Sequence, residues 1–98
     1  MRPLWMLQND AADYVLAHSR LARWTPAVAR LLARDAVSIL RMAKGEHHTR
    51  QELQRQLTAE LSPGVWLVLR WLVPIVVRLV LDWWFTELEI EHRNENFD

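Results

Sequence analysis

Residues 66–84, WLVLRWLVPIVVRLVLDWW, form the most apolar stretch of the chain. The predicted fold and function both depend on what this stretch forms. Polar or helix-disturbing residues interrupt this stretch every four positions, at Arg70, Pro74, Arg78 and Asp82. A four-residue step follows the 3.6-residue period of an α-helix and not the alternation of a β-strand. The stretch therefore predicts one very apolar helix over residues 63–88, about 40 Å long at ~1.5 Å per residue. We expect it to bend at Pro74, where proline removes a backbone donor.

Three shorter helices are expected before this stretch, and each begins at a capping signal. Thr25 and Pro26 place a capping hydroxyl before a proline at the first helical position. Thr49 is followed three residues later by glutamate, which is the spacing of a capping box. Asn9 with the aspartate after it is typical of an N-cap, and Gly45 of a C-terminal cap. These signals predict helices over residues 9–23, 26–44 and 49–61.

The helix over 26–44 has the clearest apolar face in the sequence, because its members recur at three- and four-residue steps. This predicted core face consists of Val28, Leu31, Leu32, Ala36, Ile39, Leu40 and Ala43. With the other three helices it predicts an all-α fold of four helices in a single domain, residues 1–98, ending in an acidic tail over 89–98. The joints between helices are short, which favours roughly antiparallel neighbours.

The composition limits the classes of function. The chain has 98 residues, of which 51% are hydrophobic and six are tryptophan, and it contains no cysteine. Without cysteine there are no disulfides, thiolate metal sites or thiol nucleophiles. The apolar run in the first ten residues is too short for a secretory signal and polar residues follow at once, so we expect a cytoplasmic location or the inner face of a membrane.

The helix over 63–88 is predicted to need a cover from outside its own chain. Its polar stripe of Arg70, Arg78 and Asp82, with Pro74 between them, occupies about a third of the circumference, and the remainder is Val, Leu, Ile and Trp. The shorter helices, about 18–25 Å long at the helical rise, are expected to leave part of it uncovered. Another copy, a larger complex or lipid would then complete the burial. The predicted interface residues are Trp66, Trp71, Leu72, Val76, Leu79, Val80, Trp83 and Trp84.

A membrane span is the alternative interpretation of the same helix. Trp66 lies near one end and Trp83 near the other, as in the aromatic belts of spanning helices. The basic half of the chain precedes the helix, and the positive-inside rule would then place the N-terminus in the cytoplasm. Against a span, the longest uncharged run is residues 71–77, far shorter than the ~18 residues expected.

Charge is distributed unevenly along the chain. Residues 1–44 carry seven basic and three acidic side chains, a net charge of +4, and the rest of the chain carries −4. A basic stripe of Arg30, Arg34, Arg41 and Lys44 on one helix face is a candidate contact for nucleic acid or anionic lipid, although a solvated helix face is the simpler interpretation.

The sequence contains no nucleophile–base pair, phosphate-binding loop or metal-binding quartet, and Glu46, His47 and His48 have the pattern of an exposed turn. We therefore expect no enzyme activity, no cofactor and no metal. The predicted function is a small helical structural or accessory subunit that assembles with itself or with a larger complex through residues 63–88. The alternatives are a single-span membrane protein with a basic cytoplasmic domain, and a nucleic-acid-binding module that uses the basic stripe.

Overall fold

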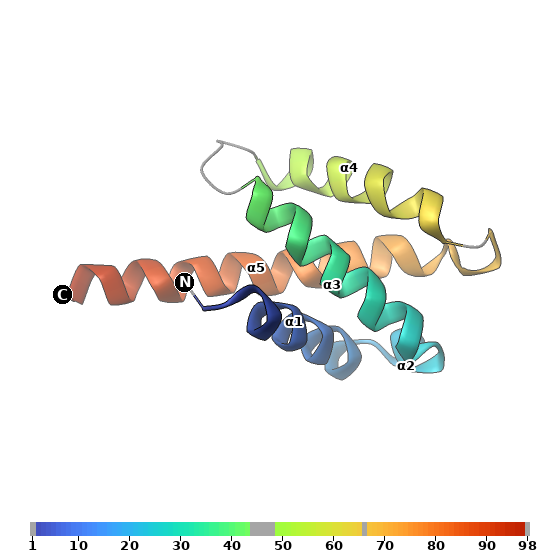
Figure 1. Cartoon of the computed structure of the whole chain (residues 1–98), viewed down its shortest axis with the longest axis horizontal. Helices are drawn as coiled ribbons and strands as arrows, with labels where there is room; N and C mark the ends of the chain where they lie inside the picture. Colours follow the sequence, from blue (N-terminus) through green and yellow to red (C-terminus); the bar gives the residue numbers. More distant parts are fainter. Residues whose placement is uncertain (1, 44–48, 66, 98) are drawn as a thin grey trace.

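The chain folds as a bundle in which three longer helices and one short helix pack against one long C-terminal helix (Figure 1). The computed structural model describes residues 2–43, 49–65 and 67–97. Its elements are α1 (Leu4–His18), α2 (Arg20–Trp24), α3 (Pro26–Met42), α4 (Arg50–Leu61), the 3₁₀ turns η1 (Ser62–Gly64) and η2 (Leu67–Leu69), and α5 (Leu72–Phe97). No strand occurs among these residues. The all-helical class predicted from the sequence is confirmed, with five α-helices instead of four.

The predicted helix over 9–23 is wrong at its start and in its continuity. α1 begins at Leu4, because the Pro3 carbonyl accepts hydrogen bonds from the backbone N–H groups of Met6 and Leu7, at 3.1 and 3.2 Å. The chain then turns extended at Ser19, with φ −139° and ψ 119°. The Ser19 hydroxyl accepts a hydrogen bond from the Ala22 N–H at 3.2 Å and caps the separate short helix α2.

Two of the predicted helix starts lie where the sequence places them. Pro26 is the first residue of α3, and Thr49 precedes α4 with its hydroxyl accepting a hydrogen bond from the Glu52 N–H at 3.2 Å. Thr25 behaves differently: its hydroxyl is buried and makes no hydrogen bond to any described residue. Proline therefore starts α3 without side-chain capping. The predicted cap at Gly45 lies outside the described residues.

The last helix differs most from the prediction over 63–88. After α4 the chain passes through η1, an extended Val65 (φ −116°, ψ 135°) and η2, and α5 begins only at Leu72. Pro74 is thus the third residue of α5, in the first turn, where a backbone N–H would have no helical partner in any case. Because Pro74 lies in the first turn of α5, it does not interrupt the hydrogen bonds of the helix interior. The predicted bend at Pro74 therefore has no physical cause.

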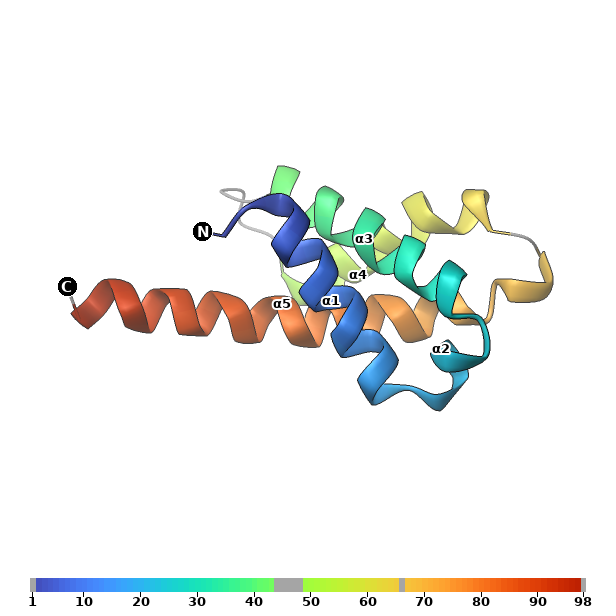
Figure 2. The same cartoon turned by 60° about the horizontal axis from the view of Figure 1, so that its bottom comes forward.

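The predicted helix end at residue 88 is a second correction, because α5 continues to Phe97 through the segment expected as an acidic tail over 89–98. Beyond Pro74 this segment contains no proline or glycine and is rich in good helix formers such as Glu, Leu and Arg. The far half of α5 projects past the other helices, beyond the N-terminus, in both views (Figures 1 and 2).

The core lies where α1, α3 and α4 cover the first half of α5. α1 and α3 pack closely on each other, and both present buried alanines, which have no atoms beyond Cβ to hold the two helices apart. From α5 the core receives Leu72, Val73, Val76, Val77, Leu79, Val80, Leu81, Trp83 and Trp84, each at most 6% exposed. Where side-chain burial is described, no polar or charged residue is buried as a whole, although the hydroxyl oxygen of the half-buried Thr25 is.

The shorter helices were expected to leave part of the last apolar helix uncovered, but they bury its apolar face within one chain. The late start of α5 explains the difference. The apolar part of α5 runs from Leu72 to Phe85, about 21 Å at the helical rise, and not the ~40 Å expected for 63–88. Helices of 15, 17 and 12 residues, α1, α3 and α4, are long enough for that span. No second chain is needed to bury this face.

Two ion pairs tie distant segments to α5. Arg50, the first residue of α4, pairs with Asp82, donates a hydrogen bond to the Arg78 carbonyl at 3.3 Å, and lies 6.0 Å from the Phe85 ring centroid. Arg2 pairs with Asp10 of α1 and with Glu87 of α5, the latter at 2.7 Å. Desolvation alone would lower the pKa of Arg2, but the two carboxylates outweigh it and raise that pKa above its ordinary value. The N-terminal residues are thereby held across α1 and α5.

Candidate interaction surface

The predicted interface residues of the last helix lie mostly in the core of a single chain. Leu72, Val76, Leu79, Val80, Trp83 and Trp84 are each no more than 6% exposed. Trp71 precedes α5 and is 42% exposed, and Trp66 lies outside the described residues. The surface of α5 that the sequence offered for docking is therefore not open to a partner while the chain is folded this way.

Two residues of the polar stripe, Arg78 and Asp82, lie on α5, and Arg70 lies in the turn before it. Arg70 and Arg78 are exposed, and the exposed Pro74 lies between them. Asp82 is half-buried because it pairs with Arg50 of α4, and not with Arg78 on its own helix. The stripe is thus a solvated helix face that also anchors α4.

The basic stripe is exposed along α3. Arg30, Arg34 and Arg41 all lie in solvent, and none of them forms an ion pair with another part of the chain that the structure describes. Lys44 falls outside the described residues. The Arg34 backbone carbonyl accepts a hydrogen bond from the Gln8 amide at 3.1 Å, which ties this side of α3 to α1.

Residues 2–43, 49–65 and 67–97 contain neither a candidate membrane span nor a candidate metal site. None of the helices there combines the length and the apolarity that crossing a bilayer requires. No group of three histidine, cysteine or carboxylate side chains there is arranged to hold a metal ion. Glu46, His47 and His48 lie outside these ranges.

The exposed large hydrophobic side chains gather at one end of the molecule. Among the described residues, eight such side chains are between 42% and 84% exposed. Six of them belong to α2, the first half of α3 and the segment before α5, and both views place α2 and that segment at the same end of the long axis (Figures 1 and 2). We name these six the apolar end: Leu21, Trp24, Leu31, Leu67, Val68 and Trp71.

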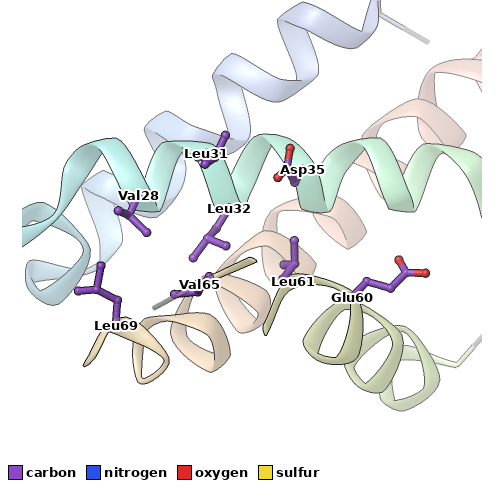
Figure 3. Close-up of a pocket in the computed structure, with 8 residues that line it drawn as sticks. All are labelled: Val28, Leu31, Leu32, Asp35, Glu60, Leu61, Val65 and Leu69. Carbon is purple, nitrogen blue, oxygen red and sulfur yellow. The ribbon is translucent and has the colours of Figure 1, made fainter. Parts of the chain in front are cut away.

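An apolar pocket of about 380 Å³ opens at this end, between α3, the last turn of α4 and the segment that follows (Figure 3). We call it the α3–α4 pocket. Four of its lining residues come from one side of α3, and the other four come from the end of α4 and the segment that follows it. They are Val28, Leu31, Leu32, Asp35, Glu60, Leu61, Val65 and Leu69.

The pocket exists because the chain does not continue as a helix after α4. Pro63 follows the last turn of α4, Val65 is extended, and the chain swings outward before α5 begins. The buried residues of the lining are Leu32, Leu61 and Val65, at 3%, 5% and 9% exposure. Leu31, 59% exposed, stands at the rim. A helix over 63–88 would have removed this opening.

Charge around the pocket is one-sided. Both charged lining residues, Asp35 and Glu60, are acidic and exposed, and Figure 3 shows them toward one end of the lining with Val28 and Leu69 at the other. The neighbouring helix α2 presents two exposed basic side chains, Arg20 and Arg23, beside Trp24. The apolar end therefore contains an acidic rim and a basic, tryptophan-bearing projection.

Sequence reasoning missed this surface for an identifiable reason. It placed Leu31 on the core face of α3, whereas the core takes the side that carries Ala29, Ala33 and Val37 in addition to Leu32, Ala36 and Leu40. The alanines were available as a signal, because small residues at 29, 33 and 36 mark a face on which another helix packs closely. The leucine at 31 then falls to one side of that face.

Comparison with known proteins gives no relative from which a function could be carried over. The chain matches none of the protein-family models, none of the curated proteins and none of the solved structures against which it was compared.

Proposed function

We propose that this chain is a small helical structural or accessory subunit, without catalytic activity, that binds a protein partner through its apolar end. The sequence suggested assembly through residues 63–88. The proposal keeps the class of function and moves the contact surface to the α3–α4 pocket and the hydrophobic residues around it. Coverage of α5 within the chain is the reason for that move.

One observation carries the proposal: of the eight large exposed hydrophobic side chains among the described residues, six lie at the end of the molecule where an apolar pocket opens, and one of them, Leu31, lines that pocket. Monomeric proteins rarely expose a large contiguous apolar patch, and such patches mark interaction sites. Two of the six are Trp24 and Trp71, and tryptophan is the residue type most enriched among the side chains that dominate binding energy. Exposed leucine and valine at Leu67 and Val68 add area on a projecting segment.

The rim chemistry favours binding over catalysis. The two carboxylates at the pocket, Asp35 and Glu60, are exposed to solvent, whereas acid–base work by paired carboxylates needs a desolvated site that separates their pKa values. Exposed charges around an apolar centre are the usual arrangement of a protein–protein interface.

Site-specific photo-crosslinking in the cells that produce the protein tests the proposal. A photoreactive residue at position 67, where Leu67 is 76% exposed in the apolar end, should form a covalent adduct with a protein. The matched control is position 42, where Met42 is 84% exposed at the far end of α3. Adducts at neither position, or equal adducts at both, would contradict a docking role for the apolar end.

A second candidate function follows from the exposed arginines of α3. Arg30, Arg34 and Arg41 extend into solvent on one helix, an arrangement able to contact phosphate groups. If these residues bind nucleic acid, the logarithm of the binding constant should fall linearly with the logarithm of salt concentration. The binding constant should be lower still in Arg34→Glu. A flat salt response would remove this candidate and leave the first proposal untouched.

A further inference from the structure

We propose that the partner at the apolar end is a second copy of this chain, and that Trp24 of each copy occupies the α3–α4 pocket of the other. This inference rests on the function proposed above and names its partner. Two features of the fold support it: Trp24 is largely exposed to solvent, and the α3–α4 pocket is not filled by any described side chain of its own chain.

Trp24 is presented on a fixed element. It is 81% exposed, yet its helix is held at both ends, by the Ser19 cap and by a hydrogen bond from the Thr25 N–H to the Ala22 carbonyl at 3.2 Å. Ala22 is fully buried, and α2 contacts both α3 and α5. An aromatic side chain presented by a fixed backbone suits an interface anchor, because binding then has to order the side chain only and not the segment that bears it.

The α3–α4 pocket has the size and chemistry that an indole needs. Its volume of about 380 Å³ lies within the usual range for a small-ligand site, and its walls are leucine and valine. An indole has one polar group, the ring N–H, which can only donate. The carboxylates of Asp35 and Glu60 line the same pocket and are acceptors. The leucine and valine walls can therefore contact the apolar ring while a carboxylate accepts the hydrogen bond of the ring N–H.

Charge on the two surfaces is complementary. Arg20 and Arg23 flank Trp24, and Asp35 and Glu60 flank the pocket; all four side chains are exposed in the single chain. When Trp24 of one copy enters the pocket of another, two basic groups meet two acidic groups. Arginine is suited to such contacts because its planar fork pairs with carboxylates in two-point geometry.

The helix α2, which ends at Trp24, and the segment before α5, which lines the pocket with Val65 and Leu69, lie at the same end of the molecule (Figures 1 and 2). A single twofold axis at that end can pair each tryptophan with the opposite pocket. A twofold interface of this kind closes on itself and does not propagate into a filament. A stable dimer buries about 800 Å² per partner, roughly an eighth of the 6570 Å² surface of this chain. The six hydrophobic residues of the apolar end supply the apolar centre of such an area.

Charge reversal separates this arrangement from other modes of assembly. One variant carries Arg20→Glu and Arg23→Glu, and the other carries Asp35→Arg and Glu60→Arg. Each variant alone places like charges opposite each other at both contacts, whereas a one-to-one mixture restores attraction at both. We expect the wild type to be dimeric by sedimentation equilibrium, each variant alone to be monomeric, and the mixture to be dimeric. Circular dichroism checks that both variants fold.

A pair of tryptophan variants tests the anchor itself. Trp24→Ala removes two equivalent contacts, each expected to lose at least about tenfold, so the dimer Kd should rise about a hundredfold. Trp5→Ala is the matched control, because Trp5 is 62% exposed in the first turn of α1, at the opposite end of that helix from α2. Its effect on Kd should stay within about twofold. Equal effects of the two substitutions would overturn the role given to Trp24.

The remaining outcomes are decisive and separate the two proposals. A wild-type chain that stays monomeric up to about 1 mM overturns the second copy as partner. If Leu67 nevertheless crosslinks another protein in cells, the proposed function survives with a different occupant of the pocket. If both charge variants stay dimeric, or if the mixture stays monomeric, the pairing of Trp24 with the α3–α4 pocket is wrong.

Discussion

Replacing Val76 by alanine tests whether the apolar face of α5 is core or interface. Val76 is 0% exposed in the single chain, although the sequence favours its placement in an assembly surface. Val68 is the matched site: the same residue type, 72% exposed, in the η2 turn. The two substitutions delete the same atoms, so the difference in stability reflects burial once the helix propensity of alanine is taken into account.

The expected magnitude follows from the atoms removed. Loss of two buried methyl groups costs about 1.6 kcal/mol at ~0.8 kcal/mol per group. The cavity left behind adds up to about 1 kcal/mol, and the better helix propensity of alanine returns about 0.5 kcal/mol. Val76→Ala should therefore lower the free energy of unfolding by about 2 kcal/mol, or about 8–16 °C in Tm for a domain of this size. Val68→Ala should change it by less than about 0.5 kcal/mol.

Urea unfolding followed by tryptophan fluorescence and circular dichroism measures both values. Both variants are made in the Trp24→Ala background, which removes the proposed self-association and with it the dependence of stability on protein concentration. The slope of free energy against urea should be unchanged, because the same surface unfolds. The reasoning is refuted if Val76→Ala leaves the unfolding free energy unchanged within about 0.5 kcal/mol, since the face would then not be packed in the monomer.

Three further predictions use the ends and ties of the helices. Thr25→Val should stabilise the fold by about 1 kcal/mol because it removes a buried hydroxyl that has no partner among the described residues. Thr49→Val should destabilise it by about 1 kcal/mol because it removes the α4 cap. Changes of the same sign in urea unfolding would contradict the different roles given to the two hydroxyls. Pro74→Ala should lower the unfolding free energy by at most about 1 kcal/mol, whereas a gain near 3 kcal/mol would show that proline lies in a helix interior. Arg50→Met should lower it by about 0.5–1 kcal/mol at low salt and less at high salt, because its pair with Asp82 is partly exposed; a loss that salt does not change would exclude the ion pair as its source.

The sequence predicted the candidate site only in part. It indicated correctly that α3 has one strongly apolar side and that tryptophan is in excess. It did not indicate that Leu31 and Trp24 would be exposed while Trp83 and Trp84 would be buried. The pocket joins α3 to residues 60–69, and no local pattern states which segments will lie side by side.

Local signals were sufficient for the helical class, for the start of α3 at Pro26 and for the start of α4 after Thr49. Such signals act between residues up to four positions apart, so they can be read directly from the order of the side chains. The start of α5 at Leu72, the covering of its apolar face and the opening beside α3 depend on contacts between segments tens of residues apart. Those contacts form only when the helices pack. Whether a valine or a tryptophan is buried or exposed therefore depends on which helix packs against it.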